Sequence, residues 1–192
     1  DPTGHFSLMQ MTNAGTAQMM SYIMKTDAGK VIVIDGGNAG ENAVKLRNIL
    51  KEKYDNKVHM WWITHPHTDH LGALNEILDD KQELTIEYIM HSRFSATHLS
   101  RERTQGEVAK AFYEKLDAEK STKVIGDIPA GACYNIDGVI IRVLGVTNEE
   151  ITVNPYNNSS MILRFEDKDK SVLFLADAGE ECGDKALKKY RH

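Results

Sequence analysis

The segment from Val58 to Leu71, V-H-M-W-W-I-T-H-P-H-T-D-H-L, constrains the chain more than any other. Its apolar and aromatic run, Met60 to Ile63, is typical of a buried strand and leads directly into a cluster of histidines with one aspartate. Imidazole nitrogens and carboxylate oxygens are ligands that zinc, manganese and iron accept. The segment therefore predicts a strand that ends in a metal-binding loop. The candidate ligands are His65, His67, Asp69 and His70.

A helix is expected directly after this loop, because Leu71, Leu74, Ile77 and Leu78 recur at helical spacing. The loop would then lie at the positive end of the helix, where an anionic ligand or substrate is favoured. The alternative is that these are ordinary loop residues in a chain that contains eight histidines. The full H-x-H-x-D-H string after a predicted strand favours the metal site.

Length and composition indicate one globular domain. The chain has 192 residues, of which 41% are apolar and 27% charged, and it contains no apolar run long enough to span a membrane. Its net charge of -5 argues against strong nucleic-acid binding, although a small phosphorylated substrate stays open. Because the first residue is Asp1, we expect a processed or trimmed chain. A secretion signal removed earlier is an open alternative, so the compartment, like the oligomeric state, is left unassigned.

Strands and helices alternate over the first two thirds of the chain. We expect strands at residues 5–11, 19–24, 31–34 and 84–90, and helices at residues 41–54 and from Val108 to Leu116. Asp35 and two glycines follow the third of these strands, in a turn that leads to no ordinary hairpin. Asp35 is either a turn former or a carboxylate that orients the metal loop through hydrogen bonds.

Residues 92–106 interrupt the alternation with hydroxyl side chains and with Arg93, Arg101 and Arg103. They either line the active site, with an arginine that holds a phosphate or carboxylate, or form a polar connection to a helix capped at Ser100. His91 and His98 are further ligand candidates. Cys133 and Cys182 lack C-x-x-C spacing and are expected to be buried free thiols, with a disulfide as the alternative.

The remainder of the chain reads mainly as strands. We expect strands at residues 124–125, 132–136, 139–146, 161–165 and 172–176, with a hairpin turn at Asp137-Gly138. The polar loop 154–160 precedes the fourth of these strands. Asp177 follows the fifth and is the next ligand candidate. Residues 180–192 are expected to form a helix whose apolar side is Cys182, Ala186, Leu187 and Tyr190.

The string T-H-P-H-T-D-H resembles the signature loop of the metallo-β-lactamase superfamily. This resemblance implies an α/β fold, an αββα four-layer sandwich in which two mixed β-sheets pack together between helices. N-N-S-S-M-I-L and V-L-F-L-A-D further resemble the branch that contains the hydrolase domain of bacterial competence DNA-uptake channels. The resemblance implies that His65 and His67 bind one ion, that Asp69 and His70 bind another, and that Asp177 bridges them. In the family, an acid in the position of Asp35 orients the loop from behind.

The chain departs from the family pattern at two places. The family places a further histidine after the strand that corresponds to residues 139–146, whereas Gly145-Val146-Thr147-Asn148 supplies none and the polar loop 157–160 is a candidate to fill that space. The family also has a last histidine beyond the helix at residues 180–192. We therefore expect residues 1–192 to be a single domain that lacks its C-terminal end.

The expected function is that of a metal-dependent hydrolase with one or two zinc ions, manganese and iron being alternatives. Asp69 would orient the attacking water as well as bind metal. Asn157, Asn158 and Ser160 would donate hydrogen bonds to developing negative charge. The expected substrate is a small anionic molecule, with phosphodiesters first and lactones, β-lactams and thioesters open. The alternatives are a degenerate, noncatalytic module of the same fold and an iron-dependent oxidoreductase.

Overall fold

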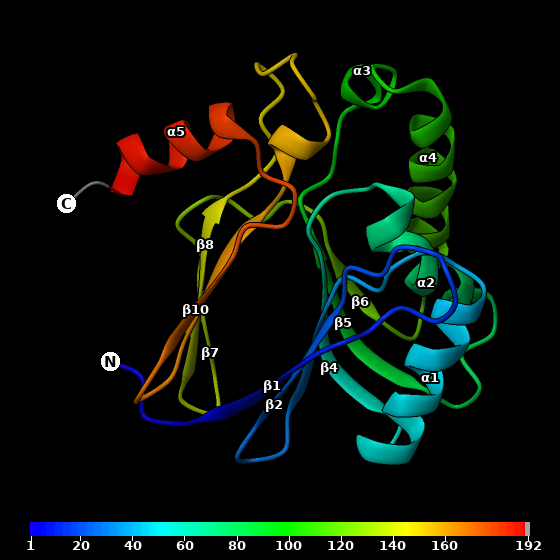
Figure 1. The fold of residues 1–192 in the computed structure, drawn as a ribbon, viewed down its shortest axis with the longest axis vertical. Helices are drawn as coiled ribbons and strands as arrows, with labels where there is room; N and C mark the ends of the chain where they lie inside the picture. Colours follow the sequence, from blue (N-terminus) through cyan, green and yellow to red (C-terminus); the bar gives the residue numbers. More distant parts are fainter. Residues whose placement is uncertain (191–192) are drawn as a thin grey trace.

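A computed structural model of the protein describes residues 1–190, and its two β-sheets face each other between helices (Figure 1). The first sheet has six strands in the order β1-β2-β3-β4-β5-β6, and the second has four in the order β10-β9-β8-β7. In the first sheet, β1 to β3 pair antiparallel and β3 to β6 pair parallel. The sequence predicts two mixed sheets, but the second sheet is antiparallel throughout, because consecutive strands reverse direction between neighbouring positions.

The strands of the first sheet are β1 (Phe6–Gln10), β2 (Tyr22–Thr26), β3 (Val31–Ile34), β4 (Lys57–Ile63), β5 (Thr85–His91) and β6 (Lys123–Ile125). Those of the second sheet are β7 (Cys133–Ile136), β8 (Val139–Gly145), β9 (Ile162–Glu166) and β10 (Ser171–Phe174). The helices are α1 (Glu41–Lys53), α2 (Thr68–Asp79), α3 (Ala96–Leu99), α4 (Arg103–Ala118) and α5 (Glu180–Tyr190), with a 3₁₀ turn η1 (Asn157–Ser159). The expected elements are confirmed in type and order, with ends that differ by a few residues, whereas α3 and η1 were not expected. Residues 191–192 of the last expected helix lie outside the described residues.

Strand β4 separates two hydrophobic cores, because successive side chains of a strand point to opposite faces of its sheet. Trp61 packs between the first sheet and the helices. Trp62 lies between the two sheets, where its ring meets Tyr134 of β7 edge-on, with centroids 5.7 Å apart. Both tryptophans are fully buried. Because Trp61 and Trp62 are buried on opposite faces of the sheet, they fix the position of β4 and of the loop that follows it.

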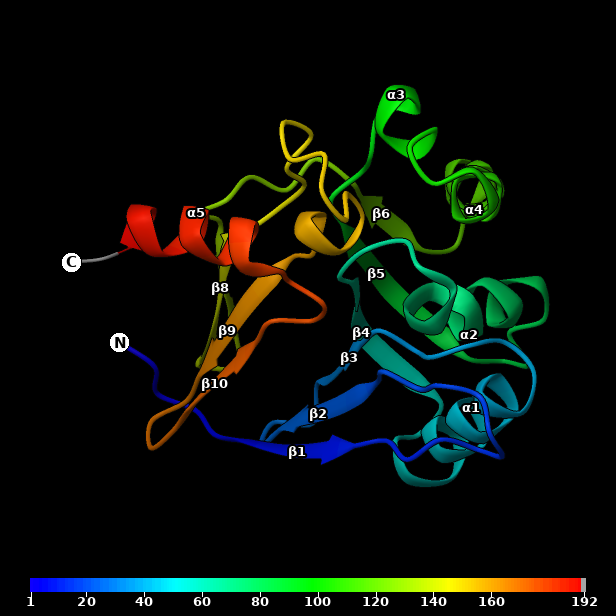
Figure 2. The same ribbon diagram turned by 45° about the horizontal axis from the view of Figure 1, so that its top comes forward.

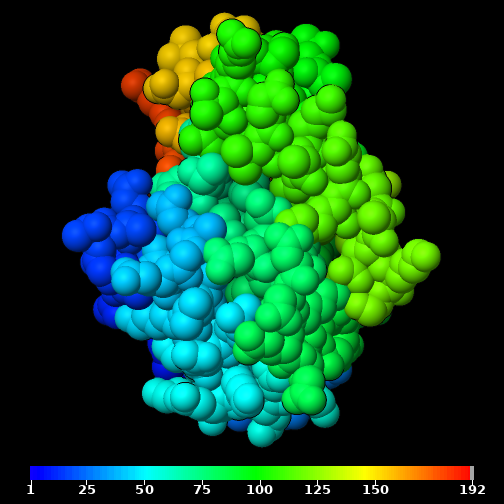
Figure 3. Space-filling model, turned by 90° about the vertical axis from the view of Figure 1, so that its right-hand side faces the viewer, coloured from blue at the N-terminus to red at the C-terminus, as the bar shows by residue number. Residues whose placement is uncertain are grey.

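Helices α1, α2 and α4 cover the outer face of the first sheet (Figure 2), and Figure 3 shows them side by side on the surface. Their buried faces join one core with the sheet. Gly72 allows α2 to approach the segment after β3 closely: a Cβ atom there would lie 2.7 Å from the backbone nitrogen of Ala39. This close approach fixes the start of α2, and with it the metal loop, against the end of β3.

Helix α5 lies on the side of the second sheet, against β8 and η1 (Figure 1). Of the predicted apolar side, Cys182, Ala186, Leu187 and Tyr190, only Cys182 is buried, and Leu187 is 66% exposed. Both cysteines are free, as expected, but Cys133 is exposed rather than buried. Within residues 1–190, we find no helix with the length and apolar character needed to cross a membrane.

The connection from β5 to α4 differs from the predicted helix cap at Ser100. The cap is Ser95, whose hydroxyl accepts a hydrogen bond from the backbone nitrogen of His98 and starts the short helix α3. Ser100 instead ends α3, and Glu102 stands at the beginning of α4. The extra turn of helix brings Glu102 over the metal loop.

Candidate metal centre

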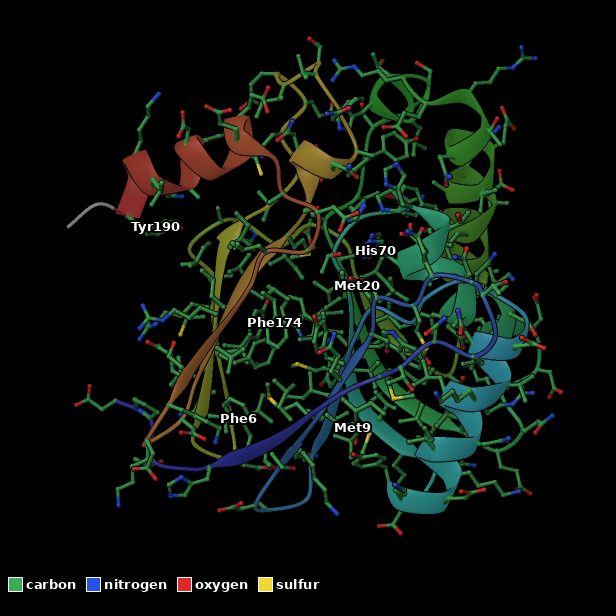
Figure 4. The ribbon with its side chains drawn as sticks, viewed as in Figure 1. Phe6, Met9, Met20, His70, Phe174 and Tyr190 are labelled. Atoms are coloured by element: carbon green, nitrogen blue, oxygen red, sulfur yellow. The ribbon has the colours of Figure 1, made fainter. Side chains whose placement is uncertain are left out.

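The ends of several strands from both sheets meet at the candidate site. Strands β3 and β4 are parallel neighbours, so Asp35 and His65, which follow them, emerge at the same edge of the first sheet. The backbone nitrogen of Met161, just before β9, donates to the carbonyl oxygen of Thr64 over 2.7 Å and ties the second sheet to this edge. Figure 4 shows His70 at this end of the space between the sheets, with Met20 beside it.

Asp35 holds the loop from behind. Its Oδ1 accepts a hydrogen bond from the Thr64 backbone nitrogen at 2.8 Å, and its Oδ2 accepts from Thr64 Oγ1 and His70 Nδ1, both at 2.7 Å. The side chain is buried, and its backbone is left-handed, with φ of 56°. These contacts support the predicted role of Asp35 in orienting the loop, which stays a prediction.

His70 is buried between two carboxylates. Burial lowers its pKa, but Asp35 and Asp177 outweigh this effect and raise the pKa to about 10. Its Nε2 atom is buried without a hydrogen-bond partner among the described residues and lies 3.3 Å from Asp177 Oδ2. This buried nitrogen, directed at the Asp177 carboxylate, can bind a metal ion once it has lost its proton.

His65 and His67 face each other, with Nε2 of His65 3.0 Å from Nδ1 of His67. On its other side, His65 Nδ1 lies 3.2 Å from Ser160 Oγ. Burial, followed by the charges of His70 and His67, holds the pKa of His65 well below its usual value. His65 is therefore neutral at physiological pH, which is the form that binds metals.

Two residues that the sequence analysis did not identify as part of the site, Glu102 and Tyr156, contact His67. Glu102 Oε2 lies 2.7 Å from His67 Nε2, and the ring of Tyr156 stacks on the imidazole with centroids 5.2 Å apart. Glu102 lies 35 positions from His67, so no local spacing signals the contact. The sequence indicates only that residues 92–106 are candidates to line the site.

The side chains form two candidate metal-binding groups that share Asp177. One contains His65, His67 and Asp177, and the other contains Asp69, His70 and Asp177. Within each group, one ligand atom from each residue lies within 4.8 Å of the others. These donors fit zinc, manganese or iron. The grouping is the same as that implied by the sequence resemblance.

Of the three candidate residues in the polar loop before β9, two contact His65 and one does not. Asn157 contacts the His65 ring, and its Oδ1 atom is buried with no hydrogen-bond partner among the described residues. Ser160 reaches His65, as given above. Asn158 instead donates to Val153 O at 2.8 Å and to Glu181 Oε2 at 3.0 Å, and accepts from the Cys182 nitrogen. Its amide thus secures α5, and the catalytic role expected for Asn158 stays a prediction without a contact to the histidines.

Two of the three arginines in residues 92–106, one of which was a candidate to hold a phosphate or carboxylate, have other partners. Arg93 forms a double hydrogen bond with Asp117, and Arg101 binds His98 Nδ1 and the carbonyl oxygen of Glu149.

His91 and His98, the further ligand candidates, belong to neither of the two metal-binding groups. His98 Nε2 lies 2.8 Å from Ser159 Oγ. His91 is buried beside Tyr113, and burial, with a smaller effect of Arg93, lowers its pKa to about 4.

A groove of about 660 Å³ opens beside the two partly exposed aspartates, Asp69 and Asp177. Its other walls come from the end of β1 and the segment that leads to β2, which reaches the site through a hydrogen bond from the Met20 nitrogen to the Asp69 carbonyl oxygen. The lining side chains from this segment are amides, hydroxyls and thioethers: Gln10, Met11, Thr12, Asn13, Thr16, Gln18, Met19 and Met20. The groove is thus polar but contains no cationic side chain among the described residues.

Comparison with known proteins agrees with this geometry. The family model described as "Metallo-beta-lactamase superfamily" matches residues 15–190. A search of curated proteins found no match.

Solved structures of low sequence identity share the fold. The metallo-β-lactamase fold protein YhfI from Bacillus subtilis matches with a TM-score of 0.55 and 16% identity, over 90% of this chain and 62% of that one. A metallo-β-lactamase from Cronobacter sakazakii matches with a TM-score of 0.54 and 18% identity, over 84% and 58%. A β-lactamase from Chitinophaga pinensis matches with a TM-score of 0.55 and 16% identity, over 89% and 67%. The chain therefore spans less than two thirds of the length of the first two.

Proposed function

The chain belongs to the metallo-β-lactamase superfamily, and on this premise we propose that it is a metal-dependent hydrolase. The observation that carries the proposal is the position of Asp177, which lies in both groups of candidate ligands. One carboxylate shared by two sets of imidazole and carboxylate donors is an arrangement that can hold two neighbouring metal ions.

We propose His65, His67 and Asp177 as ligands of one ion and Asp69, His70 and Asp177 as ligands of the other. Zinc is the first candidate for both, and manganese or iron would also accept these donors. When bound, such an ion lowers the pKa of a water molecule and polarises a phosphoryl or carbonyl oxygen. Side chains of the protein would orient the attacking water and stabilise negative charge on the substrate.

Asp69 is placed to orient the attacking water. Its carboxylate lies 3.9 Å from His70 Nε2, is 27% exposed and borders the groove, so it can accept a hydrogen bond from a water beside the substrate. Asn157 lies beside His65, where its amide nitrogen can donate to negative charge that develops on the substrate. Ser160 and Asp35 act on His65 and His70 and hold those rings in place.

The proposed substrate is a small ester that carries or develops negative charge, with phosphodiesters first. Asp69 lies in the first turn of α2, so the positive end of that helix faces the groove and favours an anion. Because the groove lacks a cationic side chain among the described residues, the rest of the substrate would be held by amides and hydroxyls such as Gln10, Thr12 and Gln18. Lactones, β-lactams and thioesters, whose reacting carbonyl becomes an oxyanion, are the next candidates.

One observation favours a second candidate, a noncatalytic module of the same fold. The segment after β8, Gly145-Val146-Thr147-Asn148, supplies no histidine, and among residues 1–190 neither His91 nor His98 joins either group of ligands. Such a module would bind metal weakly or not at all.

A substrate panel on protein loaded with zinc or manganese tests the proposal. Bis(p-nitrophenyl) phosphate, a lactone, a β-lactam and an acyl thioester would be compared, with Asp69→Asn and the exposed-site control Asp184→Asn alongside the parent chain. We expect turnover of at least one substrate by the parent and the control, and a loss of about 100-fold or more in Asp69→Asn. Equal turnover by Asp69→Asn would refute the role of Asp69. A metal-loaded parent chain that turns over none of the four would favour the noncatalytic module.

A further inference from the structure

We propose that Glu102 is a positioning residue that keeps His67 in the tautomer able to bind a metal ion, an inference that rests on the proposed metal site. The two nitrogens of the His67 ring have different neighbours. Nε2 lies 2.7 Å from Glu102 Oε2, while Nδ1 lies 3.0 Å from His65 Nε2, inside the first group of candidate ligands. Glu102 therefore acts on the side of the ring away from the site.

The chemistry of this contact decides which nitrogen carries the proton. An ionised carboxylate only accepts hydrogen bonds, so the nitrogen that it contacts must donate one. A neutral imidazole has a single N–H group, and placing it on Nε2 leaves a free lone pair on Nδ1. Metal binding requires such a lone pair. Without Glu102, His67 would divide between its two tautomers, and one of them cannot bind metal through Nδ1.

The ring is also prevented from turning. Tyr156 stacks on the face of His67, with an angle of 25° between the rings, and its hydroxyl donates to the Leu99 carbonyl oxygen at 2.7 Å. Glu102 Oε1 in turn accepts from the Tyr156 backbone nitrogen at 3.3 Å. The Glu102 carboxylate thus connects the metal loop with the polar loop before β9. It contacts His67 directly and also holds Tyr156, whose ring stacks on His67.

A purely local role for Glu102 does not account for this orientation. Glu102 stands at the beginning of α4, where a side chain that bonds to the free backbone N–H groups would stabilise the helix. Its carboxylate makes no such capping bond. Instead both oxygens are directed away from the helix, one to His67 and one to Tyr156.

Zinc affinity, measured by competition with a chromophoric chelator, gives the first test. Glu102→Ala is compared with Glu102→Gln and with Glu107→Ala, which removes an exposed glutamate from the same helix. We expect affinity to fall about 10- to 100-fold in Glu102→Ala. Glu102→Gln should recover part of the loss, because its amide oxygen can still accept from Nε2. Glu107→Ala should stay within about twofold of the parent chain, since it touches no ligand.

Nitrogen-15 NMR of the His67 ring in metal-free protein gives a readout that a merely structural role would not change. The parent chain and Glu107→Ala should show the proton on Nε2, and Glu102→Ala should show a mixture of tautomers. Unchanged zinc affinity and an unchanged tautomer in folded Glu102→Ala would overturn the inference while leaving the proposed function intact. A parent chain that binds no zinc would refute the proposed function instead, and the tautomer would still decide whether Glu102 sets the protonation of His67.

Discussion

Nδ1 of His70 lies 2.7 Å from Oδ2 of Asp35, and both side chains are fully buried. The contact joins the end of β3 to the first turn of α2 across the metal loop. The other nitrogen of His70 is thereby directed at Asp177. The pair explains why a buried charged residue stands directly after a strand of four buried apolar residues.

Removal of the Asp35 carboxylate should destabilise the fold strongly. Asp35→Ala leaves His70 and the Thr64 nitrogen without their buried acceptor, and we expect a loss of about 3–5 kcal/mol in the free energy of unfolding. Asp55→Ala is the matched control, because Asp55 has a similar left-handed backbone, with φ of 54°, but is exposed. It should cost only about 1 kcal/mol. Urea unfolding of metal-free protein measures both, and equal losses would show that backbone conformation, not the carboxylate, matters at position 35.

Asn157 and Asn158 should respond to alanine in opposite ways. Asn158→Ala breaks the hydrogen bonds to Val153, Glu181 and Cys182, so we expect a loss of about 2 kcal/mol and faster amide exchange in α5, with metal affinity unchanged. Asn157→Ala should change stability by less than about 0.5 kcal/mol and impair metal binding or turnover. Thermal unfolding and metal titration of the two variants separate these effects. The reverse pattern would restore the catalytic role expected for Asn158.

Substitution by alanine should have opposite effects on stability at two helical glycines, Gly72 and Gly183. Gly72→Ala places a methyl group 2.7 Å from the Ala39 nitrogen, and because backbone cannot move aside cheaply we expect a loss of about 1–3 kcal/mol. Gly183 in α5 has no atom within 4 Å of the equivalent position. Gly183→Ala should therefore stabilise the protein by up to about 1 kcal/mol. Chemical unfolding of both variants checks the contrast. A neutral Gly72→Ala would mean that α2 can retreat from the segment after β3.

Acid should weaken the fold through Glu119. Burial raises the pKa of this carboxyl, but hydrogen bonds from Lys81 and Ser121 outweigh it and lower the pKa to about 2. A depressed carboxyl pKa stabilises the folded state above the unfolded value of about 4.5, and this contribution is lost as the pH falls towards 2.

The expected contribution of Glu119 is about 1–2 kcal/mol after allowance for solvent screening. Glu119→Gln should thus be less stable than the parent chain at pH 6, and the difference should shrink by pH 2.5. The control is Glu114→Gln, an exposed change on α4. Unfolding free energies at several pH values test this, and a difference that is independent of pH would contradict it.

Much of the site follows from the sequence because its residues stand directly at strand ends. His65 and Asp177 could be named as candidate ligands because each follows an apolar run that reads as a strand, whereas the position of Asp35 behind the loop is implied by the family resemblance. The metallo-β-lactamase family and the αββα arrangement are confirmed. The closer likeness to competence proteins, the single-domain boundary and the role of each site residue stay predictions.

Other features depend on contacts that no local pattern records. Glu102 meets His67 only because a short extra helix, α3, displaces the start of α4. Leu187 fits an amphipathic pattern, yet it is exposed, and Cys182 is the buried residue of α5. From the sequence, an arginine of residues 92–106 could bind a phosphate, but Arg93 forms a salt bridge with Asp117 of α4. Side-chain partners of this kind are set by tertiary packing.

Metal content per chain, measured by mass spectrometry on protein purified without chelators, tests the central claim most directly. The parent chain is compared with Asp177→Ala, which removes the residue shared by both groups, and with Asp184→Ala, an exposed change on α5. We predict one to two equivalents of zinc, manganese or iron in the parent and in Asp184→Ala, and less than half of that in Asp177→Ala. A folded parent chain without metal, or an Asp177→Ala variant that retains all of it, would contradict the proposed site.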